Sequence, residues 1–402
     1  MIGWSGRRKT LTILAFILPT LLGIIVFSIY PFIFNVFISL TDRGKFHPNP
    51  DCSQTLWSIV EPTCWLSKEQ RGLATPFGIR DPWYQNYSDL IGGLFQAPGP
   101  ESLLRIAIAA IPLVGAWYAN RRLGKGLTRP VPGWVVWLAG LALAVAVGLL
   151  IDAPAAYDAL VASGDFIMVN IRTILYVLVC MPLFFILGLA MALILNNQFL
   201  RGVTFFRVIL IVPWAASTVA IMMSLVWQFF FRGQGTINQV LNIFNIEGPT
   251  YLNHDVWAFF IVVLVNLWYT YPFFMVTILG GLQSIPLDLY EAAEVDGAGW
   301  WRQLINITLP LLRPTILPII VLSTLTTYKV DAVVWGITQG GPIKGAGTPG
   351  ATEFVMVHAY KQIFQTQAFG RMGAFAVILF VALFAATLYS LRITRITEGA
   401  FE

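Results

Sequence analysis

The chain has little charge. Only 11% of its 402 residues are Asp, Glu, Lys or Arg, whereas an average soluble domain has about 25%. Hydrophobic residues make up 57%, and the mean hydropathy is +0.73. The net charge of +5 is small for this length and does not indicate a nucleic-acid-binding protein. This composition indicates a protein whose solvent is a lipid bilayer.

Motifs of nucleotide hydrolysis and metal catalysis are missing as well. No G-x-x-x-x-G-K-[ST] loop occurs, because Gly124-Lys125-Gly126 lacks the upstream glycine. The three histidines, His47, His254 and His358, lie far apart, and there is no H-E-x-x-H, C-x-x-C or G-x-S-x-G. We therefore predict no catalytic residue, no metal site and no enzyme activity in this chain.

Cysteines are few, and two of the three are close in sequence. Cys180 lies in an apolar run and is expected to be a packing residue. Cys52 and Cys64 share one polar loop. If that loop faces an oxidising compartment, a Cys52–Cys64 disulfide is expected, and two free thiols are the alternative.

Long apolar runs indicate membrane spans. A spanning helix needs about 20 mostly apolar residues, and only helices or closed barrels satisfy the backbone in lipid. The runs lack the alternation of barrel strands, so we predict an all-α, polytopic membrane helical bundle. Its eight transmembrane helices are expected at 11–36, 103–119, 132–151, 173–195, 208–231, 257–282, 315–336 and 372–391.

Basic residues near the span ends predict the orientation, because they collect on the cytoplasmic side. With the N-terminus inside, four basic residues fall in short external loops, namely Arg232, Lys344, Lys361 and Arg371. Thirteen fall in cytoplasmic segments, namely Arg7, Arg8, Lys9, Arg121, Arg122, Lys125, Arg129, Arg201, Arg207, Arg302, Arg313, Arg392 and Arg395. The bias predicts a multi-pass protein of the cell membrane with both termini cytoplasmic.

One polar loop between two apolar runs carries an unusual pattern. It reads Glu291-Ala292-Ala293-Glu294-Val295-Asp296-Gly297-Ala298, followed by Ile307-Thr308-Leu309-Pro310 and Pro314. It resembles the EAA loop of the inner-membrane permease subunits of binding-protein-dependent ABC importers, with Leu304 where Phe is usual. The run 280–286 resembles the lead-in of sugar permeases. The resemblance covers residues 10–42 and 165–395 and implies the type I ABC importer permease fold.

The residues of this loop also favour a docking role on physical grounds. Pro286 precedes a run of good helix formers, and Gly297 permits a turn that a residue with Cβ would resist. A second short helix would present Trp301, Leu304 and Ile305 as an apolar face. Such a helix pair suits a groove on a soluble partner. The alternative is a loop that only caps the two neighbouring helices.

The resemblance implies the partners and the coupling residues. The partners are a second permease subunit, two ATPase subunits that bind ATP and Mg, and an external substrate-binding protein, with no cofactor in this chain. Glu291 would be the charged anchor of the ATPase contact. The coupling residues would be Glu291, Ala292, Ala293, Asp296, Gly297, Ala298, Leu304 and Pro310.

Polar residues inside spans are candidates for the transport path. The stretch 266–273 resembles the N-x-W-x-x-x-P segment of sugar permeases, in which the Asn, positions near the following Gly and the aromatic residue after Pro line the substrate site. Thr270 stands where those permeases have Gly, so the pocket shape must differ. The resemblance implies substrate contacts by Asn266, Tyr269, Thr270, Phe273, Ser323 and Thr327. Ordinary interhelical packing is the alternative.

The predicted domains follow from the spans and the resemblance. In related permeases an external N-Y-x-x-L segment, here 86–90, leads directly to the next helix, but here about seventy residues intervene. We interpret these residues as an insertion. The predicted parts are a cytoplasmic tail and first span (1–40), an external loop (41–102), an inserted pair of spans (103–151), a permease core (165–395) with the cytoplasmic EAA loop (286–314), and a cytoplasmic tail (396–402).

The predicted function is the permease subunit of an ATP-driven importer for a carbohydrate such as maltose, trehalose or an oligosaccharide. An ion-coupled secondary transporter is the alternative. It would need titratable groups within the membrane, and only Lys329 and Asp331 qualify clearly. We expect a structural role for Asp331 and an outward-extending side chain for Lys329. A substrate contact is the alternative for Lys329. A membrane scaffold without a transport path is a third possibility.

Overall fold

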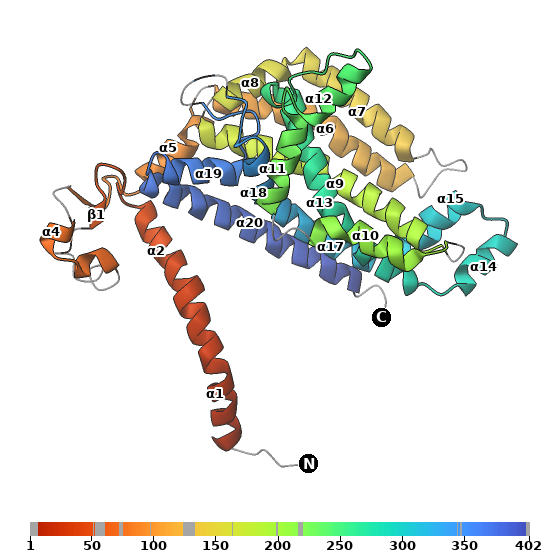
Figure 1. The fold of residues 1–402 in the computed structure, drawn as a ribbon, viewed down its shortest axis with the longest axis horizontal. Coiled ribbons are helices and arrows are strands. Elements are labelled where there is room, and N and C mark those ends of the chain that lie inside the picture. The colour runs from red at the N-terminus through yellow and green to blue at the C-terminus, as the bar shows by residue number, and fades with distance from the viewer. Residues whose placement is uncertain are drawn as a thin grey trace. The chain divides into compact units, whose positions relative to one another are not determined.

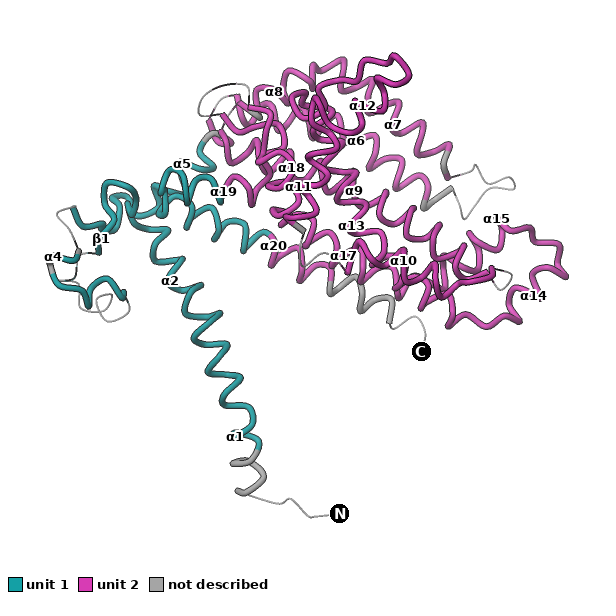
Figure 2. Tube along the Cα trace, in the orientation of Figure 1, with its two compact units in different colours: residues 1–92, 359–382 teal, residues 93–358, 383–402 magenta. Residues whose placement is uncertain are grey.

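The structure is a computed structural model. It describes residues 7–50, 52, 61–71, 75–96, 98–123, 133–162, 164–197, 200–215, 220–343, 345 and 348–398. Within these residues the fold is helical, and the strands are one short parallel pair, β1 (Asn49–Pro50) and β2 (Pro76–Phe77). The chain divides into two compact units, residues 1–92 with 359–382 and residues 93–358 with 383–402 (Figure 2).

The first unit contains the first span and the predicted external loop (Figure 1). The span consists of α1 (Arg7–Ile24), a π-helical turn η1 (Ile25–Ile29) and α2 (Tyr30–Ser39). After β1 come η2 (Pro62–Trp65), α4 (Lys68–Arg71), β2, α5 (Gln85–Ile91) and η3 (Gly92–Leu94), the last of which extends into the second unit. The unit also holds most of α19 (Val355–Phe364) and the start of α20 (Phe369–Glu398).

Buried polar contacts fix the end of the first span. Asn86 is 1% exposed, and its amide nitrogen donates to the carbonyl oxygens of Ser39 and Thr41 at 2.8 Å each. The backbone N–H of Gly370 donates to the Arg43 carbonyl at 2.9 Å. These bonds satisfy carbonyls at a helix end that would otherwise lack partners, and they join α5 and α20 to the end of α2.

The inserted residues form a helical hairpin in the second unit. Its helices are α6 (Gly99–Leu123) and α7 (Gly133–Leu150), followed by α8 (Ala153–Ala162). A Cβ built on Gly140 would lie 2.4 Å from the Ala116 Cβ. The two helices therefore pack at a distance that a larger residue would prevent. Small residues at a helix interface are typical of membrane bundles.

The core of the second unit is the long helix pair α9 (Asp165–Leu195) and α13 (Asp255–Gln283). At their closest approach a Cβ on Gly188 would lie 2.4 Å from the Phe274 Cβ. Around this pair lie α10 (Val203–Ala215), α11 (Ala220–Phe231), α12 (Thr236–Ile243), η5 (Tyr251–Asn253), α17 (Arg313–Tyr328) and α18 (Ala332–Ile337). The pair buries the largest apolar cluster of the unit and positions the polar residues discussed below.

The number of spans differs from the sequence prediction. Among the described residues, five helices are long and apolar enough to cross a membrane, at Ile13–Ser39, Gly99–Asn120, Asp165–Leu195, Asp255–Gln283 and Phe369–Ser390. Two bent pairs, 135–150 with 153–160 and 300–311 with 313–328, raise the number to seven if each is one span. The multi-pass helical fold is confirmed, and the number eight is not.

One predicted span, 208–231, has no counterpart among the seven, and a second, 315–336, ends earlier than predicted. The run 208–231 is divided between α10 and α11, and residues 216–219 lie outside the described part. The run 315–336 is divided between α17 and α18 at residues 329–331. There Asp331 caps α18, because its carboxylate accepts the Ala332 N–H at 2.6 Å. Hydropathy averaged over a window does not register such local caps.

Candidate functional site

The first arm of the EAA loop is helix α14 (Asp288–Val295), which lies at one end of the second unit (Figure 1). Asp288 and Glu291 stand in its first turn, where negative charge is favoured by the helix dipole. The helix ends at Gly297, whose φ is +74°. The N–H groups of Gly297 and Ala298 donate to the carbonyls of Glu294 and Ala293 at 3.0 and 2.8 Å. This is a Schellman ending, which a glycine in the left-handed region makes possible.

The second arm contains α15 (Trp300–Gln303), a π-helical turn η6 (Leu304–Thr308) and α16 (Leu309–Leu311). The prediction that Leu304 belongs to an exposed apolar face is wrong, since Leu304 is only 8% exposed. Leu304 opens the wider π-helical turn and faces inward, whereas Trp300, Trp301 and Ile305 are exposed. Leu304 therefore supports the loop from within.

The outer surface of the loop combines apolar and acidic groups. Val295 is 89% exposed and Trp301 is 68% exposed, while the rings of Trp300 and Trp301 meet edge to face at 4.6 Å. Glu291, Ala292, Asp296 and Gly297 are exposed, and Ala293, Ala298 and Pro310 are half-buried. Exposed aromatic groups rimmed by polar ones mark interaction surfaces. Such a surface can enter an apolar groove on a partner.

The base of the loop is held tightly. A Cβ on Gly281, near the end of α13, would lie 2.7 Å from the Leu312 side chain. Leu312, at the start of α17, is 1% exposed. The close approach brings the two ends of the loop together and attaches the loop to two core helices. A displacement of the loop would therefore reach α13 and α17 directly.

The six predicted substrate residues lie on α13 and α17. On α13, Asn266 and Tyr269 are 6% and 5% exposed. The Thr270 hydroxyl donates to the side-chain oxygen Oδ1 of Asn266 at 3.3 Å, and the Phe273 ring stacks on Trp214 of α10 with the ring centroids 6.1 Å apart. On α17, Ser323 and Thr327 are 2% and 5% exposed, one helical turn apart.

None of the six residues lines either of the apolar pockets described for the second unit. An apolar cavity of about 310 Å³ in the second unit is lined instead by Phe231, Tyr251, Trp257 and residues near them. Asn266, Tyr269, Ser323 and Thr327 face other helices in the packed bundle. A transport path along these residues therefore requires the helices to move apart.

One polar group beside them was not anticipated from the sequence. Tyr176 of α9 is fully buried, and its hydroxyl lies beside the Cys180 thiol and the Asn266 amide. Tyrosine in an apolar helix looks like a packing residue in sequence. Only the pairing of α9 with α13 brings it to Asn266.

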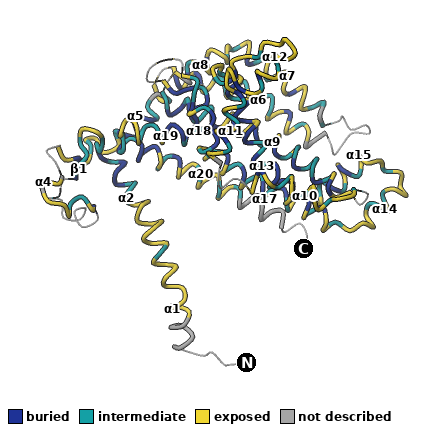
Figure 3. The backbone as a smooth tube through the Cα atoms, viewed as in Figure 1, coloured by how far each residue is buried: buried dark blue, intermediate teal, exposed yellow. Residues whose placement is uncertain are grey.

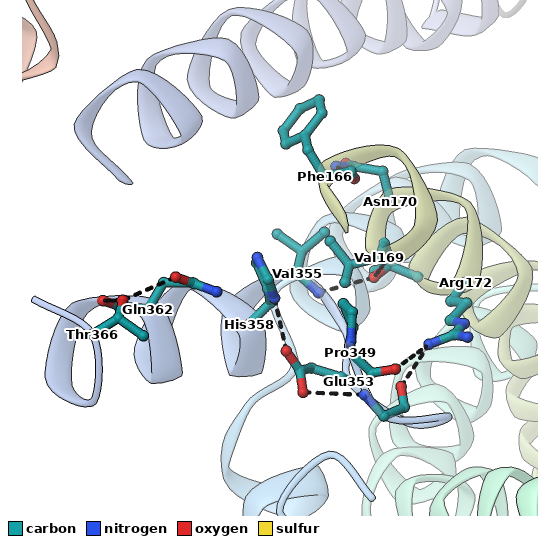
Figure 4. A network of polar contacts seen from close by, with 12 residues as sticks. Phe166, Val169, Asn170, Arg172, Pro349, Glu353, Val355, His358, Gln362 and Thr366 are labelled. Carbon is teal, nitrogen blue, oxygen red and sulfur yellow. Dashed lines mark hydrogen bonds and ion pairs between the residues drawn. The ribbon is translucent and has the colours of Figure 1, made fainter. Parts of the chain in front are cut away.

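A second network holds the segment 349–358 against the start of α9 (Figure 4). Arg172 donates to the carbonyls of Pro349 and Gly350 at 3.2 and 2.6 Å. The Val355 N–H donates to the Thr173 hydroxyl at 3.0 Å. Glu353 and His358 form a buried pair at 2.7 Å, with side chains 6% and 4% exposed. The segment is thus docked on α9 by hydrogen bonds at three places along the chain.

Four further residues singled out in the sequence have clear positions. Lys329 ends α17 and is exposed, and Asp331 is the N-cap of α18, which is a structural role. Cys52 is joined to Cys64, with the two Cα atoms 5.5 Å apart. Residues 53–60 between them lie outside the described part. Among the described residues, no group of His, Cys, Asp and Glu could hold a metal ion.

The fold and this site define a multi-pass helical membrane protein with a compact loop, partly apolar, set between two core helices. A model of the family described as "Binding-protein-dependent transport system inner membrane component" matches residues 159–395. The chain belongs to that family.

Individual relatives are similar over the same region. The chain is 33% identical over 224 residues to the trehalose/maltose transport system permease protein MalF of Thermococcus litoralis, covering 56% of this chain and 72% of the relative. It is 36% identical over 224 residues to the sulfoquinovosyl glycerol transport system permease protein SmoG of Agrobacterium fabrum, covering 56% and 70%.

One solved structure has a similar fold. A chain of a bacterial alginate ABC transporter, crystallised in complex with an alginate pentasaccharide-bound periplasmic protein, matches with a TM-score of 0.52. The identity is 20%, and the match covers 66% of this chain and 95% of that chain. At this identity the match shows the fold alone.

Proposed function

We propose that this chain is a permease subunit of an ATP-driven ABC importer that carries a carbohydrate across the cell membrane. The observation that carries the proposal is the exposed loop 286–314, which is held rigidly between α13 and α17 in a member of this family. The substrate class is supported by the names of relatives, which transport trehalose, maltose or sulfoquinovosyl glycerol.

The loop is the proposed contact with an ATPase subunit. Glu291 supplies a charge on the exposed face of α14, and Trp300 and Trp301 supply apolar area. Two such ATPases bind ATP and Mg, and their closure moves the loop. Because the loop is fixed to α13 and α17 at Gly281 and Leu312, the movement separates or closes the helices that carry the substrate residues.

A second permease subunit is the proposed partner within the membrane. The first span, Ile13–Ser39, is 27 residues long. No residue in its most apolar stretch of 18 residues is buried (Figure 3). Before Tyr30 this helix is largely exposed, whereas its end packs on α20 of the same unit, where the Phe32 and Phe380 rings lie 4.5 Å apart. An exposed apolar helix suits packing on another subunit or lipid. We propose that it packs on the second permease, and that Asn266, Tyr269, Thr270, Phe273, Ser323 and Thr327 line the shared path.

The proposed topology has eight spans with both termini in the cytoplasm. In that topology 208–231 and 315–336 cross as broken helices, and residues 41–102 are external. This places the Cys52–Cys64 pair outside the membrane, on the side of the external substrate-binding protein. The EAA loop then faces the cytoplasm, as contact with an ATPase requires.

The test is purification of the tagged chain in mild detergent, with the co-eluting subunits identified by mass. We expect a second permease and two copies of an ATPase to co-elute. Glu291→Lys should remove the ATPase, because it reverses the charge at the centre of the contact. Glu294→Lys is the matched control, since it changes the same charge three residues further along α14 and should leave the ATPase bound.

The alternative of an ion-coupled transporter makes the opposite prediction. The chain would then elute alone and would transport sugar in liposomes with an ion gradient and without ATP. That result would remove the importer proposal.

A further inference from the structure

Two buried hydrogen-bond donors converge in the seam between α9 and α13. The Tyr176 side chain is fully buried and Asn266 is 6% exposed. Neither the Tyr176 hydroxyl nor the Asn266 amide nitrogen has a hydrogen-bond partner among the described residues. They lie within reach of each other and of the Cys180 thiol. The side-chain oxygen Oδ1 of Asn266 already accepts from the Thr270 hydroxyl at 3.3 Å.

An unpaired buried donor costs free energy, so two in one place call for an explanation. Both groups are donors, so one acceptor oxygen placed between them would satisfy both. The Cys180 sulfur is a weak acceptor. A hydroxyl oxygen of a bound carbohydrate would accept from both donors.

We propose that Tyr176 is a further substrate-binding residue, which together with Asn266 binds one hydroxyl group of the transported sugar. This inference rests on the proposed function. It adds α9 to α13 and α17 as an element of the site, and it assigns a role to a residue that no motif singled out.

The ring of Tyr176 is well placed for such a role because its position is fixed. It stacks on Phe354 with ring centroids 4.4 Å apart and meets the edge of Phe259 at 6.0 Å. Little side-chain freedom is therefore left to lose when the hydroxyl binds a ligand.

The distance between the two donors is set by the backbone. Tyr176 and Cys180 lie about one turn apart on α9, and Gly188 follows two turns later. At Gly188 the backbone of α13 approaches so closely that a Cβ would lie 3.1 Å from the Met275 nitrogen. This contact limits how closely the two helices can approach. When the helices separate during transport, a sugar hydroxyl can enter between the two donors.

The test compares two tyrosines in the assembled transporter. Tyr176→Phe removes the hydroxyl and keeps the ring on Phe354. We expect KM for trehalose uptake to rise about tenfold, the equivalent of one lost hydrogen bond. The Tm should stay equal or rise, since the removed hydroxyl had no partner.

Tyr271→Phe is the matched control on α13. The Tyr271 hydroxyl donates to the Leu210 carbonyl at 3.2 Å, so its loss should lower Tm and leave KM unchanged. A structural role and a binding role thus give opposite patterns in the two variants.

Monodeoxy trehalose analogues identify the hydroxyl itself. For the analogue that lacks the bound hydroxyl, the wild type should show a higher KM than for trehalose. The Tyr176→Phe variant should show the same KM for that analogue as for trehalose. If Tyr176→Phe keeps the wild-type KM and the wild-type discrimination among all analogues, water alone satisfies these donors and the inference is wrong. If the wild-type chain elutes without an ATPase and transports sugar without ATP, the proposed function fails instead.

Discussion

The hydroxyl groups of Tyr290 and Thr308 lie 3.0 Å apart and join the two arms of the EAA loop. The Thr308 hydroxyl also donates to the Gln303 carbonyl at 3.3 Å. Tyr290 is therefore the donor in the hydrogen bond between the two hydroxyls. Thr308 is 3% exposed. This bond stiffens the loop, and a loop that transmits motion from one subunit to another has to be stiff.

Tyr290→Phe should therefore loosen the loop without removing its surface. The loss of one partly buried hydrogen bond costs about 1 kcal/mol. We expect faster hydrogen exchange in residues 288–308 and less sugar moved per ATP hydrolysed. Tyr389→Phe is the control, because Tyr389 is 69% exposed. Equal exchange in both variants would contradict the role given to this bond.

Gly297 should resist substitution because of its backbone conformation alone. Its φ is +74°, and a Cβ there would meet nothing within 4 Å. Gly297→Ala should destabilise the end of α14 by about 1 kcal/mol and reduce the amount of ATPase that co-purifies. Gly299→Ala should have little effect, because Gly299 has φ −68° and equally open surroundings. Equal amounts of co-purified ATPase in the two variants would show that the left-handed conformation of Gly297 is not needed for the contact.

Gly188→Ala should destabilise the core by overpacking. The added Cβ would lie 2.4 Å from the Phe274 Cβ and 3.1 Å from the Met275 nitrogen. We expect a cost of about 1–3 kcal/mol, measured as a lower Tm in detergent. Gly280→Ala, which meets nothing within 4 Å on α13, should keep or raise the Tm. A Gly188→Ala protein as stable as the wild type would show that α9 and α13 are less tightly packed.

Arg172→Met should release the segment 349–355 from α9. It removes the donors to the Pro349 and Gly350 carbonyls but keeps much of the apolar stem. Hydrogen bonds to a charged group contribute about 1.5–3 kcal/mol, so exchange protection should fall in the segment. Arg105→Met, at an exposed pair with Glu101, should change little. Unchanged protection in Arg172→Met would show that Thr173 and the Glu353–His358 pair suffice.

We expect one free thiol, that of Cys180, and one disulfide, Cys52–Cys64. Titration of the denatured chain with maleimide should give one thiol before reduction and three after, with Cys180 as the internal reference. Three thiols before reduction would place Cys52 and Cys64 in a reducing environment. The external location of residues 41–102 would then be wrong.

The EAA loop was predicted from sequence in some detail, because its information is local. Pro286, the helix formers after it and Gly297 are enough to place a short helix and its turn, and α14 indeed runs from Asp288 to Val295. Leu304 was placed on the wrong face, because a π-helical turn changes the helical period. No local propensity identifies such a turn.

The number of spans was only partly predictable for a different reason. Hydropathy over about 20 residues identifies α9 and α13 well, because each is one long uninterrupted helix. It joins α17 to α18, because the cap Asp331 is one polar residue in an apolar window. This break depends on a hydrogen bond to the backbone that a hydropathy average does not contain.

The sequence by itself determined the solvent, the helical class, the family motif and the loop that it forms, because each depends on composition or on residues close together in the chain. Only the tertiary structure decided that Tyr176 meets Asn266 and that Arg172 holds residues 349–350. These contacts join positions about 90 and 180 residues apart. The first contact depends on the close approach of α9 and α13, which Gly188 permits, and the distance between two side chains across a helix pair follows from packing rather than from either helix alone.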